Sequence, residues 1–190
     1  MSAEFQDVQA AGPVRPRNLL RRWRADDKGV TALEFGMVAA PFFMLLFGII
    51  GIGLYFFTTF TLENAVEQAS RLLRTGQAQQ ANMTAAQFKT KVCELVPGHI
   101  DCLGKLKVNV KSFEDSDDIT PESLPKCLDG TGSLSAATEF TPGGASKVVL
   151  VWVCFEWEFA KSLPFLNFSD MSNGSRLIQA TTTFRTEPYN

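Results

Sequence analysis

A run of 26 residues without a charged side chain, residues 35–60, constrains this 190-residue chain more than any other feature. As a helix with ~1.5 Å rise per residue, the run is about 39 Å long, whereas the hydrocarbon core of a bilayer is ~30 Å thick. The run can therefore cross a membrane with some tilt or with one end protruding. We predict a single-pass membrane protein that has the lipid bilayer as a partner.

The charges in front of the run predict its orientation. Residues 1–28 hold six basic and four acidic side chains, and every basic one lies within twenty positions of residue 35. Because positive residues stay in the cytoplasm, we expect the N-terminus inside and the C-terminal part outside. The remaining 162 residues carry 12 basic and 16 acidic side chains, a balance that does not support nucleic-acid binding.

Four cysteines follow the apolar run, and in a domain outside the cytoplasm an even number predicts two disulfides. They are Cys93, Cys102, Cys127 and Cys154. The sequence permits three pairings. The short step from Cys93 to Cys102 suits a local staple, which leaves Cys127 with Cys154. A zinc site is the competing interpretation, but there is no CxxC pair and His99 is the only histidine. We expect no metal and no cofactor.

The first predicted helix starts near Gly29 and continues past residue 60 to Gly76, over roughly 45 residues. Pro41 interrupts its inner part and can kink it. The outer third carries a stripe of apolar residues at three- and four-residue steps, typical of an amphipathic helix. The stripe consists of Leu62, Ala65, Val66, Ala69, Leu72 and Leu73.

A second helix is predicted to begin after Thr84, which forms a capping box with Gln87. Its apolar face is expected to consist of Phe88, Val92, Leu95 and Val96. The Pro97-Gly98 pair should end it.

Three segments alternate as strands: residues 105–113, 146–159 and 175–187. The second segment is apolar on both faces at its start, so we expect it to be the central strand. One face carries alternate residues from Val149 to Phe159, and on the other face Glu156 and Glu158 are expected to emerge at the end. Residues 114–145 are predicted to be mostly loop.

The predicted fold class is α+β, with a long membrane-spanning helix that extends into a small periplasmic domain of a second helix and an antiparallel sheet. The expected organisation is a basic cytoplasmic leader at 1–29, the membrane helix and its amphipathic continuation at 30–80, and the periplasmic domain at 81–190.

The sequence contains few of the residues and motifs that are typical of enzyme active sites. His99 is the only histidine, and we find neither a glycine-rich phosphate loop nor a GxSxG motif. The acidic stretch from Glu114 to Asp118 lacks the glycine and distal glutamate of a calcium loop, so we interpret it as a solvated loop. We therefore expect no enzymatic activity.

The junction in front of the apolar run is more informative. A basic leader is followed by Gly29, then Val30, and Glu34 stands five places beyond the glycine, next to Phe35. This is the order of a type IV prepilin, in which a peptidase cuts after the glycine. Glu34 would then lie one helical turn from a positively charged amino terminus, on its own or a neighbouring subunit, and could neutralise it. Alternatively, Glu34 is an interfacial residue whose negative charge is favoured by the macrodipole at the helix N-terminus, and Phe35 is a lipid-facing side chain without a specific role.

Several motifs narrow the match. The Gly-x-x-x-x-Glu-Phe start, Pro41, and the Leu-Glu-Asn-Ala…Ala-Ser-Arg stretch resemble the TadE-like pseudopilins of tight-adherence, or Flp-type, pilus systems. The chain ending "FRTEPYN" is similar to their terminal arginine-x-Glu-Pro-aromatic pattern. The resemblance covers residues 28–76 and the last few residues.

The resemblance implies a minor pseudopilin of the bacterial inner membrane, cleaved between Gly29 and Val30 by a prepilin peptidase. It implies partners among the inner-membrane pilus assembly platform, the major Flp pilin and other pseudopilins, and leaves open incorporation into the pilus. The alternative is an unprocessed, single-pass membrane-anchored periplasmic binding or adhesion module. Cleavage of the Gly29–Val30 bond is expected for the pseudopilin and not for the unprocessed module.

Overall fold

The computed structural model describes residues 29–98, 100–162 and 168–189 and divides the chain into two units, residues 1–43 and 44–190. Residues 1–28 of the leader expected at 1–29, and His99, lie outside the described residues. Helix α2, Val30–Arg74, is a single helix of 45 residues, so the predicted long helix is confirmed. Within the described part of the chain, it is the one helix long and apolar enough to cross a membrane, judged by length and composition.

The C-terminal part of α2 forms one side of the core of the second unit. The predicted apolar stripe is buried there, with Leu62 3% exposed, Val66 1% and Leu73 fully buried, while Leu72 is only partly buried. Gly76 follows in a left-handed conformation, and the short helix α3, Gln77–Gln80, comes after it. The apolar residues at helical spacing thus share one face of α2 and pack in the core.

Helix α4, Ala85–Glu94, begins as the sequence predicts. The Thr84 side chain accepts a hydrogen bond from the Gln87 backbone, and the Gln87 side chain accepts from the Thr84 backbone, which completes the capping box. Phe88 and Val92 are buried, but the prediction for Leu95 is wrong because it is 43% exposed. The helix ends at Glu94, so Leu95 leaves the helical face on which the prediction placed it.

A three-stranded antiparallel sheet completes the domain, in the order β1-β2-β3. The strands are β1 Leu106–Phe113, β2 Val148–Trp157 and β3 Arg176–Arg185. The central position predicted for β2 is confirmed. The predicted end of this strand is wrong, because Glu158 starts a short 3₁₀ helix, η4 Glu158–Ser162, in which Phe159 is 42% exposed.

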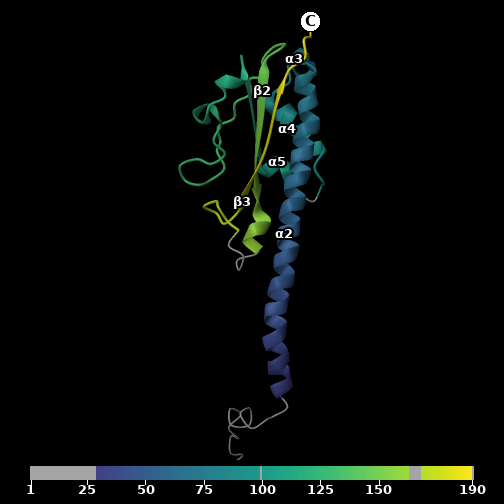
Figure 1. Ribbon diagram of the computed structural model, residues 1–190, viewed down its shortest axis with the longest axis vertical. Coiled ribbons are helices and arrows are strands. Elements are labelled where there is room, and N and C mark those ends of the chain that lie inside the picture. Colours follow the sequence, from purple (N-terminus) through teal and green to yellow (C-terminus); the bar gives the residue numbers. More distant parts are fainter. Residues whose placement is uncertain (1–28, 99, 163–167, 190) are drawn as a thin grey trace, which may run out of the picture. The chain divides into compact units, whose positions relative to one another are not determined.

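The two faces of the sheet are covered in different ways. One face, with Val149, Val151, Val153 and Phe155 of β2, packs in the main core with α2 and α4. The opposite face is covered by the segment after β1, drawn in green in Figure 1 on the side of β2 away from α2. As predicted, residues 114–145 are mostly irregular, with two short 3₁₀ turns, Ser116–Asp118 and Pro121–Ser123.

Both disulfides stabilise these layers. Cys93 pairs with Cys102, which ties the end of α4 to the start of the short helix α5, Cys102–Lys105, across a Cα–Cα distance of 5.5 Å. Cys127 pairs with Cys154 at 5.6 Å, which fixes the covering loop to the central strand. This is the pairing that the sequence spacing favours.

Candidate functional site

The start of α2 carries the predicted processing motif. Val30 is the first residue of the helix, half exposed, directly after Gly29. A Cβ atom placed on Gly29 would meet nothing within 4 Å, and the backbone there does not take the left-handed conformation that favours glycine. In the described structure, neither crowding nor conformation therefore requires glycine at this position.

Glu34 lies one helical turn beyond Val30, so the two residues share one face of α2. The side chain of Glu34 is exposed, and within residues 29–98, 100–162 and 168–189 it takes part in no ion pair. Phe35 beside it is 71% exposed. Just beyond the first turn of α2, a carboxylate and an apolar ring are thus exposed side by side along the sequence.

The apolar part of α2 continues this exposed surface. Large side chains are exposed around the helix, including Val38 at 71%, Leu45 at 64% and Ile49 at 61%. Pro41 lies inside the helix without ending it. Exposed apolar surface of this extent is typical of membrane or protein contact and is unusual for a surface in water.

An aromatic cluster marks the place where α2 meets the domain. The ring of Tyr55 stacks on Phe168 with centroids 6.3 Å apart, and it contacts Trp157 edge-on at 5.6 Å. The guanidinium of Arg176 lies 5.8 Å from the centre of the same ring. Each such contact contributes roughly 0.5–1.5 kcal/mol beyond apolar burial, so Tyr55 fixes both the end of β2 and the start of β3 to α2.

A groove opens beside this cluster, between α2, the start of α5 and the end of β2. Its volume is about 380 Å³. Apolar side chains from α2 and the sheet form most of the wall, and charged groups are present as well. The lining residues are Leu54, Phe57, Thr58, Ile100, Asp101, Lys105, Phe155, Glu156, Trp157, Glu158 and Phe159.

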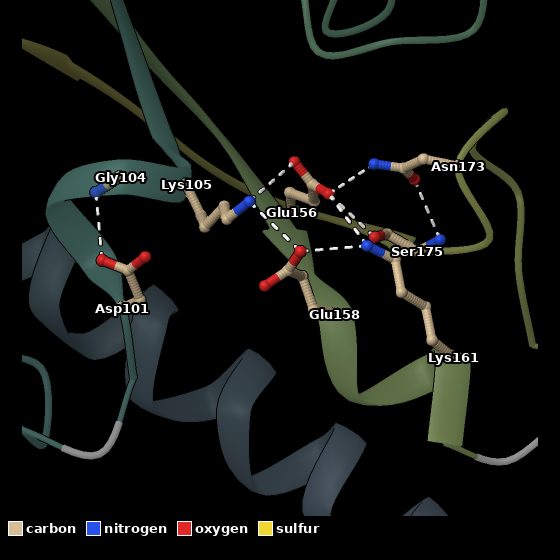
Figure 2. Close-up of polar contacts among 8 residues, drawn as sticks. All are labelled: Asp101, Gly104, Lys105, Glu156, Glu158, Lys161, Asn173 and Ser175. Carbon is tan, nitrogen blue, oxygen red and sulfur yellow. Dashed lines mark hydrogen bonds and ion pairs between the residues drawn. The ribbon is translucent and has the colours of Figure 1, made fainter.

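Glu156 is buried at the edge of the groove, so the prediction that it emerges from the sheet is wrong. Its residue is 8% exposed, and one carboxylate oxygen accepts hydrogen bonds from Asn173 at 2.6 Å and Ser175 at 2.8 Å. Figure 2 shows these donors and the side chains of Lys105 and Lys161 around the carboxylate, with both ammonium groups 3.9 Å from it. The partners compensate the loss of water that burial of a carboxylate requires.

Glu158, which is exposed as predicted, links the same two lysines. One of its oxygens accepts hydrogen bonds from Lys161 at 2.9 Å and from Lys105 at 3.2 Å (Figure 2). These hydrogen bonds lower the pKa of Glu158, the one from Lys161 most. The hydrogen bond to Glu158 raises the pKa of Lys105, with the charge of Glu156 adding to the effect. At neutral pH, the groove therefore contains charges of both signs.

The other end of α2 is held by the C-terminal tail. The backbone N–H of Glu187 donates to the carbonyl of Arg74 at 2.8 Å, and a side chain at Gly76 would collide with the ring of Tyr189. Arg185 pairs with Asp115 of the acidic loop at 3.0 Å. The arginine-x-Glu-Pro-aromatic ending thus fastens the last turn of α2, and Figure 1 shows the C-terminus beside α3.

In the acidic loop from Glu114 to Asp118, three carboxylates form ion pairs or hydrogen bonds with other groups of the domain. Besides the pair between Asp115 and Arg185, Glu114 forms an ion pair with Lys147. The Asp118 side chain accepts from the Asp115 backbone at 3.2 Å, which closes a short 3₁₀ turn. These contacts fix the loop to the chain around it.

Sequence reasoning missed the groove and the burial of Glu156. Glu156 stands on an alternating strand where the next charged residue, Glu158, is exposed, so the local pattern gives no sign of burial. Its hydrogen-bond donors, Asn173 and Ser175, lie in the turn before β3. Only the pairing of β2 with β3 brings these groups together.

Part of the chain is similar to a known protein family. A family model described as TadE-like protein matches residues 29–71. The matched segment begins at Gly29 and ends near the last turn of α2. No curated protein and no solved structure matches the chain. The family and the candidate spanning helix indicate a membrane-anchored protein associated with a Tad pilus. Over residues 29–71, the resemblance read from the sequence is confirmed: this segment is similar to TadE-like proteins.

Proposed function

We propose that the protein is a minor pseudopilin of a Tad pilus system, with a structural role in pilus assembly. A prepilin peptidase cleaves it on the cytoplasmic side between Gly29 and Val30. The mature chain then spans the bacterial inner membrane through α2 and places its disulfide-bonded domain in the periplasm. Its partners are the inner-membrane assembly platform, the major Flp pilin and sister pseudopilins.

The observation that carries the proposal is the coincidence of three features at one residue. The family match begins at Gly29, the long helix begins at the next residue, and nothing in the described structure requires a glycine there. A residue without a local structural reason fits one that is recognised from outside. Processing at this bond would supply that reason.

Cleavage would also give Glu34 a partner. The new amino group would stand on Val30, one turn from Glu34 on the same helix. In a low-dielectric environment, a carboxylate needs such a positive partner, either in its own chain or in a neighbouring subunit. Glu34 would then position α2 against the helix of another pilus component.

Replacement of Glu34 tests this role. We expect Glu34→Ala to leave the chain in the membrane but to reduce pilus assembly by about tenfold or more. The positively charged amino group of Val30, in the same or a neighbouring chain, would then lack its carboxylate partner in a low-dielectric environment. Glu63→Ala is the matched control, since it removes an exposed carboxylate from the domain end of the same helix. Filaments on the cell surface are counted by electron microscopy, with membrane levels measured by immunoblot. Normal piliation with Glu34→Ala would exclude the docking role.

A further inference from the structure

We propose that the groove between α2, the start of α5 and the end of β2 holds the headgroup and glycerol region of a zwitterionic phospholipid from the periplasmic leaflet. This inference rests on the membrane crossing of α2 in the proposed function. It goes further in assigning the folded domain its own lipid contact.

The charge-free run places the groove at the membrane surface. Leu54, Phe57 and Thr58 line the groove, and all three belong to the last seven residues of the run at 35–60. At ~1.5 Å per residue the run is about 39 Å long, which exceeds the ~30 Å hydrocarbon core by about six residues. The end of the run next to the domain therefore reaches the headgroup layer, and the groove lies there with it.

The walls of the groove match the chemistry of that layer. Leu54 is 39% exposed and Phe159 is 42% exposed, and the buried Trp157 both lines the groove and contacts the ring of Tyr55. Aromatic and aliphatic side chains next to charged groups are typical of proteins at the boundary between lipid and water. The volume of about 380 Å³ lies within the ~300–1,000 Å³ range of small-molecule sites.

The charges select the headgroup. The lining contains one ammonium group, on Lys105, and three carboxylates, on Asp101, Glu156 and Glu158. The ammonium group of Lys161 pairs with Glu156 and Glu158 from beside the groove, which leaves a surplus of one carboxylate. A zwitterionic headgroup can place its phosphate at Lys105 and its own ammonium among the carboxylates. A headgroup with a negative charge alone would meet the acidic surplus. The groove therefore fits a zwitterionic phospholipid better than an anionic one.

Photocrosslinking of the full chain tests the proposal. The protein is reconstituted into phosphatidylcholine vesicles that contain a phosphatidylcholine with a diazirine near the glycerol end of one acyl chain. After irradiation, lipid adducts are mapped by peptide mass spectrometry. We expect adducts on α2 and also on peptides that contain residues 100–105 and 155–159. Adducts on α2 alone would overturn the lipid site, while an absence of adducts on α2 would overturn the membrane crossing and the proposed function with it.

Two comparisons sharpen the test. Phe159→Ser should reduce the adducts on residues 100–105 and 155–159 by about tenfold, because the groove loses an exposed aromatic side chain from its wall. Leu95→Ser is the matched control, since Leu95 is 43% exposed and lies outside the groove. An anionic phosphatidylglycerol probe should label the groove about threefold less. Equal labelling by the two lipids, or equal effects of the two variants, would contradict the assignment.

Discussion

The two parts of the continuous helix α2 differ in how their apolar side chains are exposed. From Val30 to Phe57 the helix is apolar around its circumference, and side chains such as Phe35 and Leu45 are more than 60% exposed. From Thr58 to Arg74 it carries a single buried stripe, with Val66 and Leu73 almost inaccessible. The first part has no partner of its own size within the described chain, whereas the second is completed by the sheet and α4.

The difference shows where each part of the helix obtains its stability. The apolar stripe of the second part gains free energy when the domain folds. The first part would leave a large apolar surface in water, so its stabilising environment is supplied from outside the domain, by lipid and, in the proposed function, by the helices of other subunits. The proposed function depends on this division of α2 into a part that meets the membrane and other subunits and a part that supports the domain.

The largest expected effect comes from a matched pair of leucines, one in each part. Leu73→Ala should lower the free energy of unfolding of the domain by ~2–5 kcal/mol, because a fully buried side chain leaves a cavity. Leu45→Ala, at a position 64% exposed, should change it by less than about 0.5 kcal/mol. Denaturant unfolding in detergent, followed by tryptophan fluorescence, measures both. Similar losses would show that the two parts of α2 are not distinct.

A pair of glycines gives a smaller effect. Gly76→Ala should destabilise the domain by ~1–3 kcal/mol, because Gly76 has a φ of 76° and its Cα faces the ring of Tyr189. At Gly53→Ala a Cβ would meet nothing within 4 Å, and the domain should keep its stability. Thermal unfolding distinguishes the two variants. An unchanged midpoint for Gly76→Ala would mean that the C-terminal tail does not hold the end of α2.

The smallest effect concerns pH at the boundary between the two parts. Hydrogen bonds from Lys161 and Lys105 lower the pKa of Glu158 from its ordinary value of 4.5. A lowered carboxylate pKa contributes stability above pH 4.5 that is lost as the pH falls through the lowered pKa. We therefore expect the amide protection factors in η4, taken relative to the intrinsic exchange rate at each pH, to fall under acidic conditions, with those of the α2 stripe unchanged.

The control for this pH effect is Glu158→Gln, which removes the titrating group. In this variant, the protection factors in η4 should no longer fall as the pH drops below the ordinary pKa of the carboxylate. An equal loss of protection in both proteins would place the pH dependence on another group.

Much of the fold, including the division of α2 into an exposed apolar part and a part packed in the domain, could be predicted from the sequence. The charge-free run, the stripe from Leu62 to Leu73 and the capping box at Thr84 are local patterns with a fixed helical spacing, and the structure contains each of them. The central place of β2 followed from its two apolar faces. Short-range periodicity determines which surfaces an element can bury, so these features could be predicted.

The errors have two causes. Leu95 is exposed because the helix ends one residue earlier. Glu156 is buried because strand pairing brings Asn173 and Ser175 to it, and the contact of Gly76 with Tyr189 spans more than a hundred positions. No local pattern encodes such distant contacts, and the groove that Glu156 borders was therefore not predicted.

The central claim is that the helix is released at Gly29, so that α2 begins the mature protein. The most direct measurement is the N-terminal residue of the chain purified from native membranes, by mass spectrometry. The account predicts a mature protein that starts at Val30 and keeps the whole of α2. A chain that retains residues 1–29, in cells with an active prepilin peptidase, would contradict the account and leave an unprocessed membrane-anchored binding or adhesion module.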